Sequence, residues 1–265
     1  MNGNLIATLL VLILCAGAAL AGVVMSDEPS DPSVITNTPN QVEETVDEET
    51  PSEEEEEPAE ELPEEDLTDT WELLLANPDH PLPNDFEVET ANVQGDFVMD
   101  ERVADAMKEM IADAKEENVD LMICSAYRSI DRQQELFDAE VAVQMNNGKS
   151  KEEAEKITAT MIAIPGTSEH HTGLAADIVT PTHQTLDPEF ADTAAGKWLQ
   201  ENAAEYGFIL RYPEDKQDIT KIIYESWHYR YVGVDHAKAI TENGLCLEEY
   251  LEILKEGGLE KDGEL

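Results

Sequence analysis

The sequence is poor in basic residues, cysteines and aromatic side chains. No lysine or arginine precedes Arg102, and the chain holds 16 basic residues against 60 acidic ones, a formal net charge of −44. Such a chain repels phosphate backbones, which argues against nucleic-acid binding. Three cysteines exclude a disulfide scaffold. One lies in the N-terminal apolar run, and we expect Cys124 and Cys246 to be two separate buried thiols.

Charged residues are also missing from the N-terminus. The run Leu5–Met25 contains none and is about long enough to span a bilayer as a helix. A membrane anchor and a cleaved secretion signal both fit residues 1–26: the small residues Ala19–Ala21 favour cleavage, whereas no basic residue precedes the apolar run. We therefore expect an extracytoplasmic protein, secreted or anchored to the outer face of the cytoplasmic membrane, with no other membrane contact.

Residues 27–70 are rich in Pro, Glu, Thr and Ser and nearly free of aromatic residues. Such a segment buries too little apolar surface to offset the entropy of ordering it, and its charge repulsion favours extension. We predict a disordered acidic stalk. From residue 71 onward the composition becomes that of a globular protein, and residues 71–265 have the length of one ordinary domain.

Helices and short strands follow one another in this domain without regular alternation. Apolar residues recur at helical spacing over 100–118. Further helices are expected at 131–148, with Asp131 as the N-cap, and near 150–161, 189–205, 235–243 and 246–256. Strands are expected at 119–127, 175–179, 208–211 and 227–232. The pattern favours the α+β class: a single compact domain with a small, mainly antiparallel sheet flanked by helices, and the candidate site at the sheet.

Three polar motifs carry candidate chemistry. His170 and Asp177 lie in PGTSEHHTGLAADI, Glu225 and His228 in ESWHYRY, and Arg128 in SAYRSIDRQQ. Two histidines and one carboxylate suffice to hold a catalytic zinc ion with a fourth position open to water. A further carboxylate that does not bind the metal is suited to take a proton from that water. A fixed guanidinium is suited to balance negative charge on a carbonyl oxygen.

The spacing of Glu225 and His228 demands a particular backbone. Residues three apart in a regular strand point to opposite faces, so we expect Glu225 before a bulge or at the start of a strand and His228 inside it. Each motif alone is more often structural than catalytic, and their co-occurrence carries the argument. We expect His171 to wall the pocket or to form hydrogen bonds. The remaining histidines are expected to be structural or on the surface: His80, His183 and His236.

Four motifs, in this order and at these separations, resemble the VanY-type zinc D-alanyl-D-alanine carboxypeptidases: SAYRSIDRQQELF, PGTSEHHTGLAADI, YGFILRYP and ESWHYRYVG. The resemblance runs from about residue 71 to about residue 250. It implies one zinc ion held by His170, Asp177 and His228, with Glu225 as general base and Arg128 facing the reacting carbonyl. Ser168 and Gln133 match positions that contact substrate in relatives. Further substrate-contact candidates are Ser125, Tyr127 and Trp227, with Arg211 as a secondary one for binding a carboxylate.

The resemblance also implies the substrate: a peptidoglycan stem peptide, from which metal-activated water removes the terminal D-alanine. We expect a monomer. A D,D-dipeptidase, a peptidoglycan endopeptidase on the same zinc site and a non-catalytic wall-binding module stay open as alternatives. The chain departs from the commonest family pattern at Ala126, His171 and Ser226, where Gly, Gln and Pro are frequent. None of these changes removes a ligand or the base, and the last is expected to loosen the turn that places Glu225.

Overall fold

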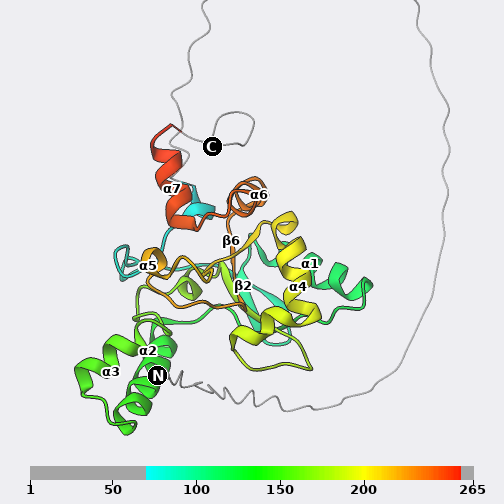
Figure 1. Cartoon of the computed structure of the whole chain (residues 1–265). Coiled ribbons are helices and arrows are strands. Elements are labelled where there is room, and N and C mark those ends of the chain that lie inside the picture. The colour runs from blue at the N-terminus through cyan, green and yellow to red at the C-terminus, as the bar shows by residue number, and fades with distance from the viewer. Residues whose placement is uncertain (1–69, 258–265) are drawn as a thin grey trace, which may run out of the picture. The chain divides into compact units, whose positions relative to one another are not determined.

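The computed structural model describes residues 70–257 (Figure 1). The predicted leader, residues 1–26, lies outside the described residues, as does the predicted stalk apart from its last residue. Within 70–257, no helix has both the length and the apolar character needed to cross a membrane.

A four-stranded sheet lies at the centre of the described domain. Its strands, in spatial order, are β3 (Met122–Ser125), β4 (Ala175–Val179), β6 (His228–Tyr231) and β5 (Phe208–Leu210), and each neighbouring pair is antiparallel. All five residues of β4 are buried, because this strand has a partner on each side and is covered on both faces. The small antiparallel sheet with flanking helices confirms the predicted α+β class.

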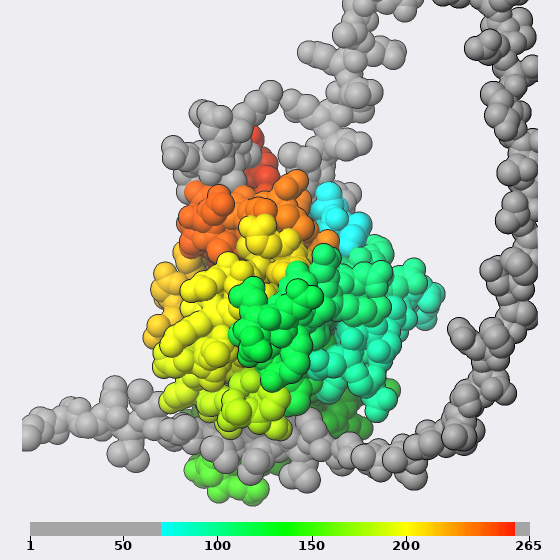
Figure 2. All heavy atoms as spheres, turned by 90° about the vertical axis from the view of Figure 1, so that its right-hand side faces the viewer, coloured from blue at the N-terminus to red at the C-terminus, as the bar shows by residue number. Residues whose placement is uncertain are grey.

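Helices α1 (Ala104–Glu116) and α4 (Ala194–Asn202) cover the sheet through the main hydrophobic core and lie side by side (Figures 1 and 2). The buried residues of α1 follow helical spacing, which gives this helix one apolar stripe. Tyr206, in the 3-10 turn after α4, donates a hydrogen bond to Asp113 of α1 at 2.7 Å. The two helices therefore form one layer against the strands.

Two further helix pairs complete the domain. Helices α2 (Ile130–Asn146) and α3 (Lys151–Thr158) pack against each other through Phe137, Val141 and Ala154. Helices α6 (Val234–Glu242) and α7 (Leu247–Lys255) share a second core cluster with β5. The short helix α5 (Gln217–Thr220) and four 3-10 segments fill the connections: Trp71–Leu73, Glu169–Thr172, Pro188–Asp192 and Ala203–Tyr206.

Some local predictions were wrong. The N-cap of α2 is Ser129, not Asp131, which lies inside the first turn. The backbone of Ser129 is extended, and its side-chain oxygen accepts a hydrogen bond from the amide of Arg132, as is typical of an N-cap residue. The expected helix at 189–205 is divided into α4 and the two 3-10 segments around it. The hairpin of β1 (Thr90–Gln94) and β2 (Phe97–Asp100) was not predicted, because its strands are short and only partly buried.

Cys124 and Cys246 do not form a disulfide, as predicted, and Cys246 is buried whereas Cys124 is partly exposed. Gly173 closes the turn that leads into β4. It has a φ of +71°, and a Cβ atom there would lie 2.7 Å from the backbone nitrogen of Asp100. The same amide donates to the carbonyl of Gly173 at 3.0 Å, so the turn is pressed against β2. Only glycine combines this conformation with this close approach.

Candidate active site

Side chains from two neighbouring strands and the turn before them converge on one point. Asp177 of β4 lies opposite His228 of β6 in the antiparallel register, and residues directly opposite share one face of a sheet. His170 comes from the 3-10 turn that precedes β4. Its Nε2 lies 3.4 Å from Asp177 Oδ2, and His228 Nδ1 lies 3.0 Å from Asp177 Oδ1. The three ligand atoms lie within 4.8 Å of one another, close enough for one cation to reach all three.

The donor atoms of this cluster suit a zinc ion. His170 Nδ1 lies 2.7 Å from the carbonyl oxygen of Ala126, which places the ring proton on Nδ1 and leaves Nε2 as an acceptor. That Nε2 is buried and has no hydrogen-bond partner. Two imidazole nitrogens and one carboxylate oxygen are a donor set that zinc favours. The residues present therefore fit the metal that the motifs imply.

Burial and neighbouring charges set the protonation of the cluster. Burial first, and then the charge of Arg128, lower the pKa of His170 to about 4. Burial alone would also lower the pKa of His228, but its contacts with Asp177 and Glu169 outweigh burial and raise that pKa to about 9. Burial opposes ionisation of Asp177 too, yet the two histidines hold its pKa well below the usual range. Asp177 is therefore ionised at neutral pH, as a metal ligand must be.

Glu225 lies beside the cluster in the turn before β6. Its Oε2 is 3.6 Å from His228 Nδ1, and its carbonyl accepts from the amide of His228 at 3.3 Å. Glu225 thus lies in the turn three positions before β6, instead of before a bulge or at the start of the strand, and His228 is the first residue of β6 instead of lying inside it. Burial raises the pKa of Glu225 to about 8. A carboxyl group with a pKa near the working pH is suited both to accept and to return a proton.

Arg128 flanks the cluster from the segment after β3. Its Nη1 donates to Gln133 Oε1 at 3.0 Å, and its Nη2 lies 3.5 Å from Asp177 Oδ2. Gln133 in turn donates to the carbonyl of Ala163 at 2.7 Å. Burial lowers the pKa of Arg128, and the charges of Asp177 and Glu225 oppose this effect. The guanidinium is therefore held in one orientation at the edge of the cluster.

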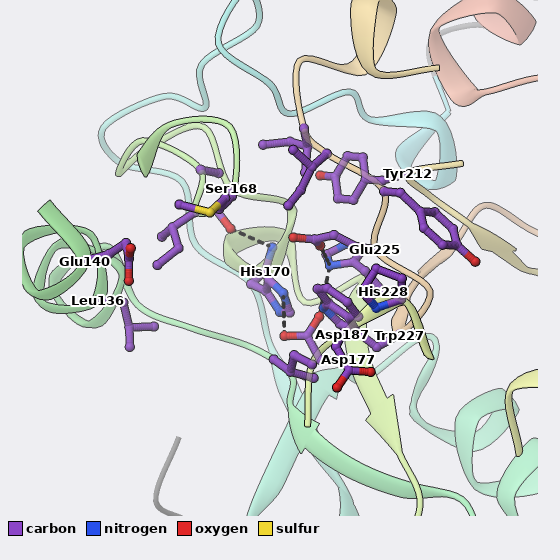
Figure 3. Close-up of a pocket in the computed structure, with 18 of the residues that line it drawn as sticks. Leu136, Glu140, Ser168, His170, Asp177, Asp187, Tyr212, Glu225, Trp227 and His228 are labelled. Atoms are coloured by element: carbon purple, nitrogen blue, oxygen red, sulfur yellow. Dashed lines mark hydrogen bonds and ion pairs between the residues drawn. The ribbon is translucent and has the colours of Figure 1, made fainter. Parts of the chain in front are cut away.

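These side chains line a pocket of about 380 Å³. Figure 3 shows His170, Asp177, Glu225 and His228 converging on one side, with Leu136 and Glu140 of α2 on the other. Among the predicted substrate contacts, Gln133, Ser168 and Trp227 line the pocket. Apolar side chains make up much of its remaining wall: Leu136, Met161, Ile162, Leu186, Ile222 and Ile223.

Ser125, Tyr127 and Arg211 do not line the pocket. Ser125 pairs with Asp177 at the end of β3. The amide of Tyr127 is bonded to the carbonyl of Val98 at 3.0 Å, and its side chain is 38% exposed. Arg211 is fully buried and binds protein carboxylates instead of facing the cavity. The structure therefore places these three residues outside the lining of the pocket.

The other histidines form hydrogen bonds outside the cluster. Since the Nε2 of His171 accepts from the amide of Gly166 at 3.2 Å, its Nδ1 donates to the carbonyl of Arg128 at 2.7 Å. His171 thus connects the loop before the 3-10 segment Glu169–Thr172 to the segment that carries Arg128, and it does not line the pocket. The ring nitrogens of the remaining histidines bond to nearby side chains: His80 to Asn77, His183 to Asp187 and His236 to Tyr250.

Sequence reasoning missed the wall that α2 contributes. Leu136 and Glu140 line the pocket at helical spacing after Gln133, and residues three and four apart share one face of a helix. With Gln133 as a predicted substrate contact, this spacing indicates that Leu136 and Glu140 lie on the same face of the helix. Asp187 was missed as well, since it belongs to a loop that only the tertiary fold brings beside β6.

A buried His/Asp/His cluster, a carboxyl group of raised pKa beside it and a fixed guanidinium at one pocket define a metal-dependent hydrolase. Residues 96–234 match the family model VanY, described as D-alanyl-D-alanine carboxypeptidase. This chain belongs to that family and is a peptidase.

Named relatives agree with this membership. The putative carboxypeptidase YodJ of Bacillus subtilis (strain 168) is 43% identical over 194 residues, which cover 69% of this chain and 68% of YodJ. A mutant of the vancomycin-resistance D,D-pentapeptidase VanY, solved in complex with Zn(II), is 38% identical with a TM-score of 0.63; the match covers 69% of this chain and 99% of that one. The LdcB LD-carboxypeptidase is 42% identical with a TM-score of 0.57, and the match covers 67% of this chain and 84% of LdcB.

Proposed function

We propose that this domain is a zinc-dependent D-alanyl-D-alanine carboxypeptidase that removes the terminal D-alanine from peptidoglycan stem peptides. The observation that carries the proposal is the buried cluster of His170, Asp177 and His228 at a pocket that Glu225 and Arg128 also line. The Zn(II) complex of a relative with 38% identity supports zinc as the metal, with one ion bound at this cluster.

His170 Nε2, a carboxylate oxygen of Asp177 and His228 Nδ1 would hold the zinc ion. When bound, such an ion lowers the pKa of coordinated water and polarises a carbonyl group. The protein supplies the rest of the chemistry. Glu225 accepts the proton that the attacking water loses as its oxygen bonds to the carbonyl carbon. It then returns this proton to the nitrogen of the departing D-alanine as the peptide bond breaks.

Arg128 stabilises the negative charge that develops on the carbonyl oxygen. Gln133 and Asp177 hold the guanidinium in place before the reaction, so little reorganisation is needed when the charge appears. Gln133, Ser168 and Trp227 contact the substrate, and the apolar wall of the pocket excludes water from it.

A second candidate activity is L,D-carboxypeptidase, in which the terminal D-alanine follows an L-residue. One observation favours it: this chain is 42% identical to the LdcB LD-carboxypeptidase and 38% identical to the D,D-pentapeptidase. Both activities use the same cluster and differ in the stereochemistry that the pocket accepts at the residue before the cleaved bond.

The deciding experiment incubates the purified protein, with zinc and after chelation, with three substrates: a pentapeptide stem, a tetrapeptide stem and free D-Ala-D-Ala. We expect zinc-dependent release of D-alanine from the pentapeptide. Release only from the tetrapeptide would establish the L,D activity instead, and release only from the dipeptide would establish a D,D-dipeptidase. Cleavage within the stem would indicate an endopeptidase. Wall binding without any release would indicate a non-catalytic module.

We also propose that the protein acts outside the cytoplasmic membrane, since its substrate belongs to the cell wall. Residues 1–26 export or anchor it, the acidic segment 27–70 serves as a stalk, and the domain acts as a monomer. Fractionation of cells that express the full chain, followed by mass measurement of the N-terminus, distinguishes a cleaved signal from an anchor. Recovery of the protein in the cytoplasmic fraction would contradict this placement.

A further inference from the structure

Glu169 forms a buried charge cluster behind the candidate metal site. The side chain is 1% exposed and does not line the pocket. Its Oε1 accepts two hydrogen bonds, from Arg211 Nε at 2.7 Å and from Arg230 Nη1 at 2.8 Å. Its Oε2 is buried and has no hydrogen-bond partner. One half of this carboxylate is therefore fixed by two arginines, while the other half faces a different group.

That group is the imidazole of His228. Its Nδ1 faces Asp177, whereas its Nε2 lies 3.6 Å from Glu169 Oε2. The Nε2 atom is likewise buried and without a hydrogen-bond partner. Two buried polar atoms without hydrogen-bond partners thus face each other: His228 Nε2, which can donate, and Glu169 Oε2, which can accept. Buried polar groups are rarely left unpaired, and a contraction of a few tenths of an ångström would join these two.

The two histidines of the cluster differ in this respect. His170 directs Nε2 toward the ligand cluster and uses Nδ1 to bond the backbone carbonyl of Ala126. His228 directs Nδ1 toward the cluster, so only Nε2 is left for a supporting contact, and no backbone carbonyl is bonded to it. Histidine ligands generally donate their second N–H to a carboxylate or carbonyl, which fixes the tautomer and the ring orientation. Glu169 is the carboxylate in that position.

We propose that Glu169 is a positioning residue: it accepts the Nε2 proton of His228 and so presents Nδ1 to the metal. This inference rests on the proposed role of His228 as a ligand. Glu169 touches neither the pocket nor the reacting atoms and acts through His228 alone.

Segments outside the matched family region hold this carboxylate in place. Arg211 also binds Glu248 of α7, through Nη2 at 2.7 Å and Nη1 at 2.9 Å. Arg230 Nη2 donates to the carbonyl oxygens of Glu72 at 3.0 Å and Leu74 at 2.7 Å. The matched region covers 96–234, so α7 and the segment before β1 both lie beyond it. They complete the support of a residue inside it.

The charge balance of the cluster explains how it tolerates burial. The positive charges of two arginines, Arg211 and Arg230, balance the negative charges of two carboxylates, those of Glu169 and Glu248. A buried ion cluster of this kind is weak as a source of stability, because desolvation offsets much of the attraction. Its value here lies in orientation: with both arginines on Oε1, the second oxygen is directed at one target, His228 Nε2.

The test compares three variants of the full chain: Glu169→Gln, Glu169→Asp and the control Glu248→Gln. The control removes a carboxylate that binds Arg211, as Glu169 does, but that does not itself face His228. Zinc affinity is measured by competition with a chromophoric chelator, and folding by circular dichroism and thermal unfolding. We expect Glu169→Gln and Glu169→Asp to weaken zinc binding by about 10–100-fold. Glu248→Gln should lower the unfolding temperature and keep zinc affinity within about threefold of the wild type.

Wild-type zinc affinity in a folded Glu169→Gln protein would overturn the proposal. An equal loss in Glu248→Gln would also overturn it, since the effect would then reflect the whole charge cluster. If the Glu169 variants fail to fold, nitrogen-15 NMR of histidine-labelled wild type decides. Zinc-loaded protein should show His228 protonated at Nε2, with slow exchange, and metal-bound at Nδ1; the reverse assignment rejects the proposal. Zinc binding without peptidase activity would leave this inference standing and refute the proposed function, whereas a wild type that binds no zinc refutes both.

Discussion

Replacement of the proposed base by its neutral isostere, Glu225→Gln, is predicted to stabilise the metal-free protein while abolishing activity. A carboxyl group ordinarily titrates near 4.5, and burial raises the pKa of Glu225 to about 8. Between these two values the folded chain retains a proton that the unfolded chain releases. The wild type therefore loses stability as the pH rises from about 4.5 through about 8. A glutamine carries no proton to lose and escapes this penalty.

The size of the effect follows from the same two values. Each pH unit between the unfolded pKa and the folded one costs about 1.4 kcal/mol. At pH 7 the penalty on the wild type amounts to roughly 3 kcal/mol, and it should nearly vanish at pH 4.5. For a domain of this size each kcal/mol shifts the unfolding temperature by about 2–4 °C, so the variant should unfold roughly 6–12 °C higher at pH 7.

The assay is urea and thermal unfolding of both proteins after chelation, followed by circular dichroism from pH 4.5 to pH 8.5. Glu140→Gln is the matched control. Glu140 lines the same pocket and is equally buried, at 7% exposure, but it accepts a hydrogen bond from Gln144 at 2.7 Å that the neutral variant weakens. It should give no gain. A Glu225→Gln protein no more stable than the wild type at pH 8, or a gain that does not shrink toward pH 4.5, would refute the reasoning.

Three further predictions concern the residues around the cluster. Arg128→Lys should lower the turnover number by about 10²–10³-fold, because a point charge replaces a fixed guanidinium beside the developing oxyanion; D-alanine release measures it. His171→Ala should cost about 1–3 kcal/mol in urea unfolding and leave zinc affinity unchanged, because it unpairs the amide of Gly166 and the carbonyl of Arg128. Zinc binding at pH 7 should release at least one proton, from His228, whose pKa is about 9; calorimetry in buffers of different ionisation enthalpy measures it.

Each of these has a clear contrary result. Full turnover in Arg128→Lys would remove the guanidinium from the mechanism. A loss of zinc binding in His171→Ala would show that His171 does more than connect two loops through hydrogen bonds. The control is His171→Gln, which keeps one hydrogen-bond donor and one acceptor. Because zinc displaces a proton from His228 below pH 9, affinity should fall as the pH falls; an affinity independent of pH between 6 and 9 would contradict the assignment.

The sequence allowed the His/Asp/His cluster to be predicted because its members lie in short motifs. His170 and Asp177 are seven positions apart around one glycine turn, and aromatic and β-branched residues identify the strand of His228. Their meeting point then follows from one strand pairing, in which Asp177 lies opposite His228.

What the sequence did not reveal depends on contacts between distant segments. The proposed role of Glu169 depends on arginines 42 and 61 positions away in the sequence. No local sequence pattern indicates that one oxygen of this carboxylate binds these arginines while the other faces His228. Ser125 and Tyr127 lie with Arg128 in the polar motif at the end of a strand, yet only Arg128 of the three lines the pocket. At the end of a strand, neighbours in sequence diverge in space, so adjacency alone is a poor guide to a site.

The turn that carries Glu225 shows how a departure from the family pattern is accommodated. A serine stands at position 226 where proline is frequent, and the loss of the ring predicts a looser turn. In the structure Ser226 is 2% exposed, and its hydroxyl donates to the carbonyl of Asp187 at 3.0 Å. The amide of Glu225 donates to the carbonyl of Tyr212 at 3.2 Å. Hydrogen bonds to two separate segments thus restrain the turn in place of a ring, and both of the residues that accept them, Asp187 and Tyr212, line the pocket beside Glu225.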